Sequence, residues 1–177
     1  MTTKTGKTLV AVTFMAFLLA CTAAQAARIQ LVEAQQLALG TMEIPSSGSN
    51  TRIVSAAGAG SGTGTYISGT VQEGHFDVYC TQQCGVGQLT SVTLSIISAG
   101  IGSCTGMTSI GTFTGSFTDK NGTTSAVTFP ATIPRASIGT TAGTSRLNVG
   151  ATGTYPSTVA ETSGCAPTFS VQITVTP

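Results

Sequence analysis

The chain has 177 residues and little charge: 7% of its residues are Asp, Glu, Lys or Arg, and the formal net charge is +1 at pH 7. No basic tract is present to hold a phosphate backbone, which argues against nucleic acid as a ligand. Glycine is abundant, with 22 residues, and Ser and Thr take the place of charged side chains. Such a surface suits a protein that packs against copies of itself, and it equally suits a Thr-rich secreted domain.

The first 26 residues have the pattern of a secretory signal peptide. Lys4 and Lys7 precede an apolar run over residues 9–20, and Ala24-Gln-Ala26 is a small-x-small cleavage site. The run is too short for a membrane-spanning helix. We therefore expect export through the inner membrane, a location at the cell surface or outside the cell, and a single mature domain over residues 27–177.

A second processing site is an alternative. Leu18-Leu-Ala-Cys21 resembles the bacterial lipobox, in which the cysteine becomes the lipidated first residue. Leu at the middle position fits that pattern imperfectly, whereas the alanine site downstream fits well. Lipid anchoring at Cys21 is therefore the minor alternative.

Four cysteines follow the signal peptide, and an even number in an exported chain predicts two disulfides. Neither C-x-x-C pairs nor histidine partners accompany them, so a zinc site is not expected. Cys80 and Cys84 lie near the same end of the predicted domain, whereas Cys104 follows a strand of about eight residues that spans roughly 26 Å. Because bridged Cα atoms lie within about 7 Å of each other, we predict the pairs Cys80–Cys84 and Cys104–Cys165.

Residues 27–44 form the first predicted element, a weak strand. Its apolar residues share one parity with two polar interruptions: Ile29, Leu31, Leu37 and Leu39, broken by Glu33 and Gln35. A helical stub is the alternative, because residues 31, 34, 35 and 38 also suit one helical face. Gly40 and Pro45-Ser-Ser-Gly-Ser punctuate the segment as a turn, which favours the strand.

A short strand is expected at residues 52–55, before a glycine-dense stretch at residues 56–65. This stretch does not match G-x-G-x-x-G, and no Gly-Lys-Ser/Thr follows it, so a phosphate-binding loop is not indicated. Glycines that allow positive φ in a surface loop are a sufficient explanation.

From Tyr66 onward the sequence predicts one short strand after another, around residues 76–80, 92–97, 113–117, 126–129 and 147–149. The segment Asp119-Lys-Asn-Gly122 carries the Asn-Gly pair that favours a tight hairpin. Seven to nine such strands, with no internal repeat and no linker, indicate an all-β fold. We predict an immunoglobulin-like antiparallel β-sandwich and leave open whether its final strand is missing.

The most regular alternation is in residues 167–177. Apolar residues occupy one face and polar residues the other, which is typical of a half-buried strand; the apolar set is Phe169, Val171, Ile173 and Val175. We expect Phe169, Val171 and Ile173 of this face in the core, together with Phe76, Val78, Leu94, Ile96, Phe113, Phe117 and Phe129. The strand also needs a neighbour on each side, supplied by an earlier strand or by another molecule.

Catalytic chemistry is not expected. His75, the only histidine, shares a strand face with Asp77, and their spacing would let them touch. The opposite face carries Phe76 and Val78, so this pair should point to solvent, and no G-x-S-x-G motif supplies a nucleophile. The carboxylates are too few and too scattered for a calcium site or a glycosidase pair, and no cofactor is expected.

Several short motifs resemble a family of small exported bacterial β-sandwich proteins of uncharacterised function. They are Leu37-Ala-Leu-Gly40 with its following Pro-Ser-Ser-Gly turn, Gly74-His-Phe-Asp-Val78, Leu147-Asn-Val-Gly-Ala151, Gly153-Thr-Tyr155 and the final Phe-x-Val-x-Ile-x-Val. The chain departs from the family in having Ala38 in place of an aromatic residue, four added cysteines and Pro177 in place of a terminal aromatic residue. The family is related in plan to chaperone–usher pilins.

The resemblance implies a structural pilus (fimbrial) subunit. Pilins of this kind lack their last strand, and the N-terminal extension of the next subunit fills the groove. Here the extension would be residues 27–39, with Ile29 and Leu31 as pocket-filling side chains. The acceptor groove would be lined by Phe169, Val171, Ile173 and Val175. Expected partners are copies of the chain or related subunits, a periplasmic chaperone and an outer-membrane usher.

The alternative is a self-complete monomeric sandwich that acts as an adhesin or a carbohydrate-binding module, with a host or surface glycan as its partner. In that case residues 27–39 should pair within their own chain and should bury Leu37 and Leu39.

Overall fold

The computed structural model describes residues 28–43, 48–63, 65–85, 87–156 and 161–177. The predicted signal peptide, including Cys21, lies outside these residues. The described chain is built almost entirely of antiparallel strands, which confirms the all-β prediction. Within it no helix is long and apolar enough to cross a membrane.

The larger sheet, here called sheet A, is centred on β11 (Arg146–Tyr155). One edge of β11 pairs with β8 (Ser109–Thr118), which in turn pairs with β9 (Thr124–Val127). The other edge pairs first with β6 (Gly74–Gln82) and then with β3 (Asn50–Val54). The sheet ends at β1 (Arg28–Gln35) beside β6 and at β4 (Gly60–Gly62) beside β3.

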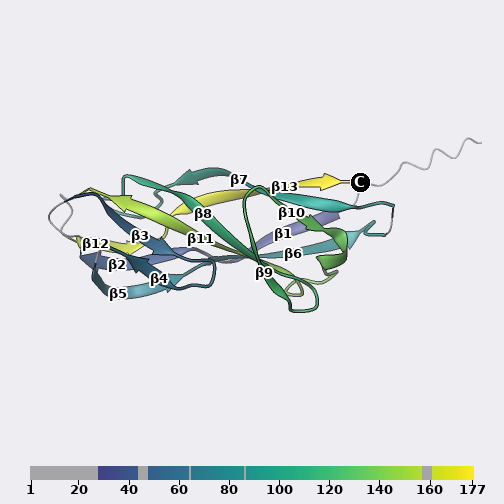
Figure 1. Cartoon of the computed structure of the whole chain (residues 1–177), viewed down its shortest axis with the longest axis horizontal. Helices are drawn as coiled ribbons and strands as arrows, with labels where there is room; N and C mark the ends of the chain where they lie inside the picture. Colours follow the sequence, from purple (N-terminus) through teal and green to yellow (C-terminus); the bar gives the residue numbers. More distant parts are fainter. Residues whose placement is uncertain (1–27, 44–47, 64, 86, 157–160) are drawn as a thin grey trace, which may run out of the picture.

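Two smaller sheets face sheet A. Sheet B has the order β12 (Glu161–Cys165), β2 (Ala38–Glu43), β5 (Thr65–Gln72), and sheet C has the order β10 (Ala131–Pro134), β7 (Ser91–Gly100), β13 (Thr168–Thr176). A 3-10 turn, η1 (Arg135–Ser137), follows β10. The result is an elongated sandwich with sheet B at one end and β10, β13 and β1 at the other (Figure 1).

The chain changes sheet at one shared corner. β1 belongs to sheet A and β2 to sheet B, whereas β5 belongs to sheet B and β6 to sheet A. Two side-chain amides tie these crossings together: Gln35 Nε2 donates to the carbonyl of Glu73 at 2.9 Å, and Gln72 Nε2 donates to that of Gln36 at 2.9 Å. The corner therefore fixes where the N-terminal strand leaves one sheet for the other.

The core divides into two clusters along the long axis. The cluster between sheets A and C contains the fully buried side chains of Val78, Leu94 and Leu147. The cluster between sheets A and B contains Leu37, Leu39 and Tyr155. Four of the predicted core residues are buried: Phe76, Val78, Leu94 and Phe117.

Six other predicted core residues pack against the first cluster but are only partly buried: Ile96, Phe113, Phe129, Phe169, Val171 and Ile173. For the residues of β13 the reason is that this strand lies at the edge of its sheet. Sheet A therefore covers their inward face incompletely.

The Asn-Gly hairpin is confirmed, with Thr118 opposite Thr124 and Gly122 at φ +84°. The Asp119 carboxylate accepts the N–H groups of Thr123 and Asn121, each at 2.8 Å. These bonds, that from Thr123 foremost, hold the pKa of Asp119 below its usual range. The Asp119 carboxylate therefore stabilises the turn in its ionised form.

Three short strands escape the sequence prediction. β4 lies inside the glycine-dense stretch that is predicted as a loop, where Gly62 adopts φ +137° beside the backbone of Thr51. β10 and β12 have four and five residues, too few to show a clear alternation. Pairing with β3, β7 and β2 makes these segments strands.

Two residues of β7 provide a matched test of the core. Leu94 is 0% exposed, whereas Ile97 is 59% exposed. Leu94→Ala should lower the free energy of unfolding by about 2–5 kcal/mol because it leaves a cavity. Ile97→Ala should change it by no more than about 0.5 kcal/mol. Denaturant titration of both variants checks this, and equal effects would contradict the assigned inward face.

Tyr155 makes stability depend on alkaline pH. Its side chain is buried, and burial raises its pKa to about 12 from 10.0, with Arg52 acting in the opposite direction. The phenol therefore ionises in the unfolded chain before it does so in the folded one. Its contribution is complete below pH 10 and should be lost as the pH rises towards 12. Unfolding midpoints measured across this range should fall less steeply in Tyr155→Phe than in the wild type, and identical slopes would refute the assignment.

Candidate assembly site at the edges of β1 and β13

Among the described strands, β13 has a neighbour on one side only. It pairs with β7 from Thr168 opposite Gly100 to Thr176 opposite Ser91, and no other described strand pairs with its outer edge. Its burial alternates strictly between exposed and half-buried residues along nine positions. The half-buried residues are the four predicted acceptor positions: Phe169, Val171, Ile173 and Val175.

Phe169 links the two core clusters. Its ring lies 5.6 Å from that of Phe76 in an edge-on arrangement and 5.6 Å from that of Phe113. It packs against residues of both clusters. A Cβ atom on Gly74 would come within 2.8 Å of the Phe169 ring, so any side chain at this position would displace the ring. The start of β13 is therefore anchored firmly.

The segment from β12 to β13 passes from sheet B to sheet C. Cys165 pairs with Gly40 of β2, whereas the carbonyl of Ala166 accepts the N–H of Ser103, which follows β7. The N-terminal segment changes sheet at residues 36–37, between β1 of sheet A and β2 of sheet B.

β1 is held at one edge of sheet A. It pairs with β6, from Arg28 opposite Gln82 to Gln35 opposite His75, and the register shifts near both ends. Its inward residues Ile29 and Leu31 are half-buried against the same cluster that contains the β13 residues. The outward residue Val32 is 44% exposed. The strand therefore contributes little fully buried surface.

The predicted N-terminal extension consists of two parts with different packing. Residues 28–35 form the half-buried edge strand, whereas Leu37 and Leu39 are 0% exposed in the second cluster. The structure thus brings the predicted donor residues Ile29 and Leu31 together with the predicted acceptor residues inside one chain. It also pairs the extension within its own chain, the arrangement expected of a self-complete sandwich.

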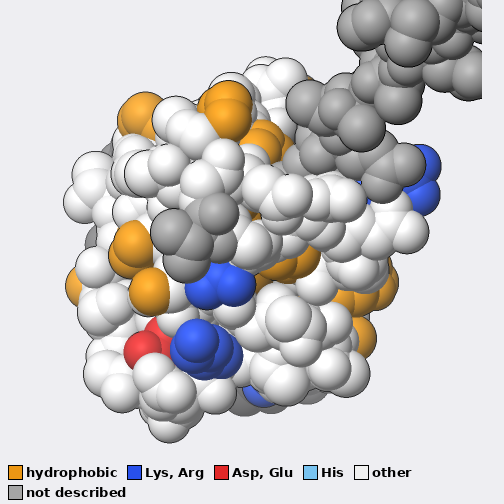
Figure 2. All heavy atoms as spheres, turned by 90° about the vertical axis from the view of Figure 1, so that its right-hand side faces the viewer, with side chains coloured by type: hydrophobic (Ala, Val, Ile, Leu, Met, Phe, Trp, Pro, Cys, Tyr) orange, Lys and Arg blue, Asp and Glu red, His pale blue; other side chains and the backbone are white. Residues whose placement is uncertain are grey.

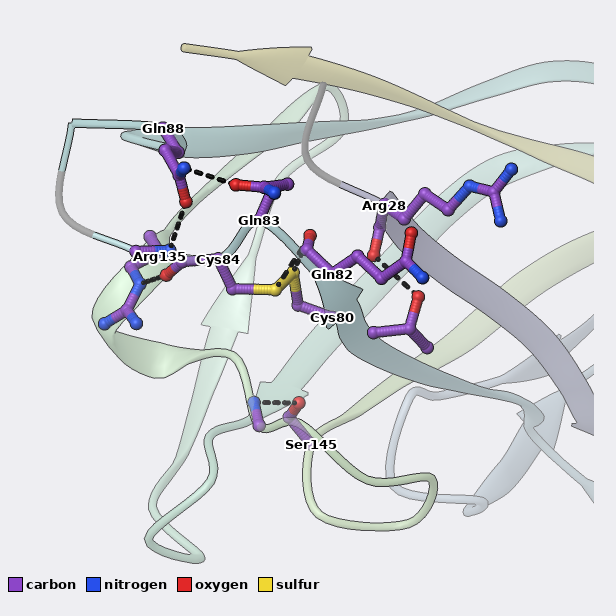
Figure 3. Close-up of a disulfide and its surroundings, with 11 residues drawn as sticks. Arg28, Cys80, Gln82, Gln83, Cys84, Gln88, Arg135 and Ser145 are labelled. Atoms are coloured by element: carbon purple, nitrogen blue, oxygen red, sulfur yellow. Dashed lines mark hydrogen bonds between the residues drawn. A yellow bond between two sulfur atoms is a disulfide. The ribbon is translucent and has the colours of Figure 1, made fainter. Parts of the chain in front are cut away.

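Both predicted disulfides are present. The Cα atoms are 6.1 Å apart in Cys80–Cys84 and 4.3 Å apart in Cys104–Cys165. Cys80–Cys84 closes the end of β6 beside the start of β1, where Thr81 Oγ1 donates to the carbonyl of Arg28 at 3.3 Å (Figure 3). Cys104–Cys165 joins the loop after β7 to β12. Two disulfides indicate an extracellular or otherwise oxidising environment.

His75 and Asp77 lie on the outer face of β6, with side chains only 13% and 16% exposed. His75 Nε2 is 3.4 Å from Asp77 Oδ1, and Arg146 Nε is 3.9 Å from the same oxygen. The expectation that both side chains point to solvent is therefore only partly met. Among the described residues no group donates a hydrogen bond to either facing atom, and no cluster of His, Cys, Asp and Glu could hold a metal.

Comparison with known proteins gives no relative for this chain. No family model, no curated protein and no solved structure matches it. The fold and the residues described above are therefore the basis for assigning a function.

Sequence reasoning finds the side chains of this site but misses their pairing. Alternation identifies Ile29, Leu31 and the four residues of β13, whereas it gives no partner for either strand. The sequence did contain one signal for the Phe169 contact. Gly74 lies on the same strand face as Phe76 and Val78, and an isolated glycine in a strand often marks the close approach of another group to the backbone.

The two disulfides should differ in what they contribute to stability. Cys104–Cys165 closes a sequence separation of 61 residues and Cys80–Cys84 one of 4. The chain-entropy relation gives about 4 kcal/mol for the former and roughly 2 kcal/mol for the latter. Replacing each pair with alanines and measuring unfolding by denaturant should give this order. The reverse order would show that the short disulfide loop orders more of the structure than loop closure implies.

Proposed function

We propose that this chain is a structural subunit of an exported fibre of the pilus type, joined by exchange of an N-terminal strand between copies. The observation that carries the proposal is the outer edge of β13, with which no described strand pairs, together with its four half-buried apolar side chains. An open edge of this length would otherwise be an aggregation site, so a strand that covers it is expected.

Strand addition fits this edge. An incoming strand would form backbone hydrogen bonds along β13, and its alternate side chains would cover the inward face. The side chains that would gain cover are Phe169, Val171, Ile173 and Val175. Backbone pairing supplies affinity, and the apolar positions fix the register.

β1 has the properties of an exchangeable donor. It is an edge strand, and its inward residues Ile29 and Leu31 are only half-buried. Leu37 and Leu39, which belong to the second core cluster, lie beyond the corner and stay with their own subunit. The arm can therefore leave β6 without removing a fully buried side chain.

Exchange of this kind produces a fibre. The donor arm and the acceptor edge are different surfaces, so the contact is head-to-tail and can repeat without closing. The proposal includes export to the cell surface, a periplasmic chaperone that covers β13 until assembly, and an outer-membrane usher. The two disulfides support passage through an oxidising compartment.

A second candidate is a self-complete exported module with an adhesive or carbohydrate-binding role. The observation that favours it is the pairing of β1 with β6 of the same chain, together with the complete burial of Leu37 and Leu39. In this case the β1 arm is a permanent part of the fold and no copy needs to supply a strand.

Deletion of residues 28–33 separates the two functions. In a fibre subunit the deletion should abolish polymers while the remaining sandwich, kept with its chaperone, stays folded. Size-exclusion chromatography reports the polymer, and near-ultraviolet circular dichroism reports the fold. Gln30→Asp, which changes an outward-facing residue of the same strand, is the matched control and should still polymerise.

In a self-complete module the same deletion should lower the free energy of unfolding, because it uncovers β6. Wild-type protein that stays monomeric at high concentration, with residues 28–35 protected from proteases, would end the fibre proposal in favour of the module.

A further inference from the structure

A second site lies away from the β13 edge. The turn between β8 and β9, η1 and the loop before β11 enclose a cavity of about 310 Å³, lined by Lys120, Asn121, Arg135, Ile138, Gly139, Thr140 and Thr144. We propose that this cavity binds one acidic sugar residue, carboxylated or sulfated, of a polysaccharide. The proposal goes beyond the fibre function and does not depend on it.

Two of the few cations of the chain meet in this cavity. Arg135 is fixed by the hydrogen bond that its Nε donates to the carbonyl of Cys84. Its terminal guanidinium nitrogens lie on the side away from Cys84 (Figure 3). Lys120 is positioned by its backbone N–H, which donates to the carbonyl of Ser137 at 3.0 Å. Within the described chain neither side chain has a carboxylate partner within 4.0 Å.

One neighbouring carboxylate, that of Asp119, offsets part of this charge. Asp119 precedes Lys120, and its carboxylate already accepts the N–H groups of Asn121 and Thr123. Two cations, Lys120 and Arg135, are therefore partly balanced by one carboxylate, which is hydrogen-bonded within the turn. Basic side chains gather on the end of the molecule seen in Figure 2, within a surface that is mostly uncharged. An anionic ligand would therefore meet a site with a small net positive charge.

The rest of the lining favours a sugar over a bare anion. Asn121, Thr140 and Thr144 supply amide and hydroxyl groups, and Thr144 Oγ1 donates to the carbonyl of Thr141 at 2.5 Å, which leaves its lone pairs to accept. Ile138, 6% exposed, adds an apolar wall. A cavity of this size suits a small organic ligand held by a few polar groups.

The test is isothermal titration calorimetry of the exported full chain with three oligosaccharides of equal length: an oligouronate, a sulfated one and a neutral one. At least one acidic oligosaccharide should bind about tenfold more tightly than the neutral one. Comparing the oligouronate with the sulfated oligosaccharide shows whether the site prefers a carboxylate or a sulfate. Lys120→Gln should lower that affinity by about tenfold, since a hydrogen bond to a charged group is lost. Lys120→Arg should retain most of it.

Arg146→Gln is the matched control, because it removes the same charge from an exposed side chain outside the cavity. An equal loss of affinity in Arg146→Gln and Lys120→Gln would overturn the proposal in favour of general attraction of polyanions. Equal binding of the neutral ligand, or of inorganic sulfate and the sulfated sugar, would overturn the acidic-sugar class. Amide shifts at residues 139–144 on titration of the acidic ligand would support it, and their absence on binding would place the ligand elsewhere.

Discussion

The sandwich depends on the contact between the ring of Phe169 and the backbone of Gly74. The ring occupies the space that a side chain at position 74 would fill, and from there it contacts both core clusters. Gly74 is also the first residue of β6, where the chain has just crossed from sheet B to sheet A. One ring therefore holds the sheet-changing corner and the start of β13 in a fixed relation.

This constraint divides the N-terminal segment by its packing. Leu37 and Leu39 lie on the sheet B side of the corner and are completely buried, so their removal would leave cavities. Ile29 and Leu31 lie on the sheet A side, in the edge strand β1, and are only half-buried. Moving them into solvent therefore costs less hydrophobic free energy than moving Leu37 and Leu39. In the proposed assembly the β1 arm leaves β6 for the β13 edge of another copy, whereas the second cluster stays within its own chain. The free energy available to assembly then comes from covering β13.

The local features of the fold are predictable from the sequence, and the pairing of distant segments is not. Alternation identifies β13 and β6, and the Asn-Gly pair identifies the hairpin at Gly122, because each signal depends on neighbouring residues. The strand-length argument also gives both disulfides. Alternation shows which face of a strand is apolar but not how far the opposite sheet extends over it, so the partial burial of Val171 and Ile173 is not foreseen.

The same limit applies to function. The pairing of β1 with β6 is set at the corner, where the side chain of Gln35 donates to the β5–β6 connection and that of Gln72 donates to the β1–β2 connection. No local sequence pattern predicts this pairing. Lys120 and Arg135 are 15 positions apart in sequence and meet only because Lys120 bonds Ser137. Sites assembled by such long-range contacts require the structure, whereas the apolar strand faces that the assembly proposal uses can be read in advance.

Amide hydrogen exchange along β13 tests the central claim most directly. Half of the peptide groups in this strand point away from β7, towards the unpaired edge. In the isolated chain these alternate amides should exchange fast while those facing β7 are protected. If copies join by strand exchange, the fast set between Thr168 and Thr176 should become protected on assembly. Assembled material in which these amides still exchange as fast as in the monomer would contradict the account.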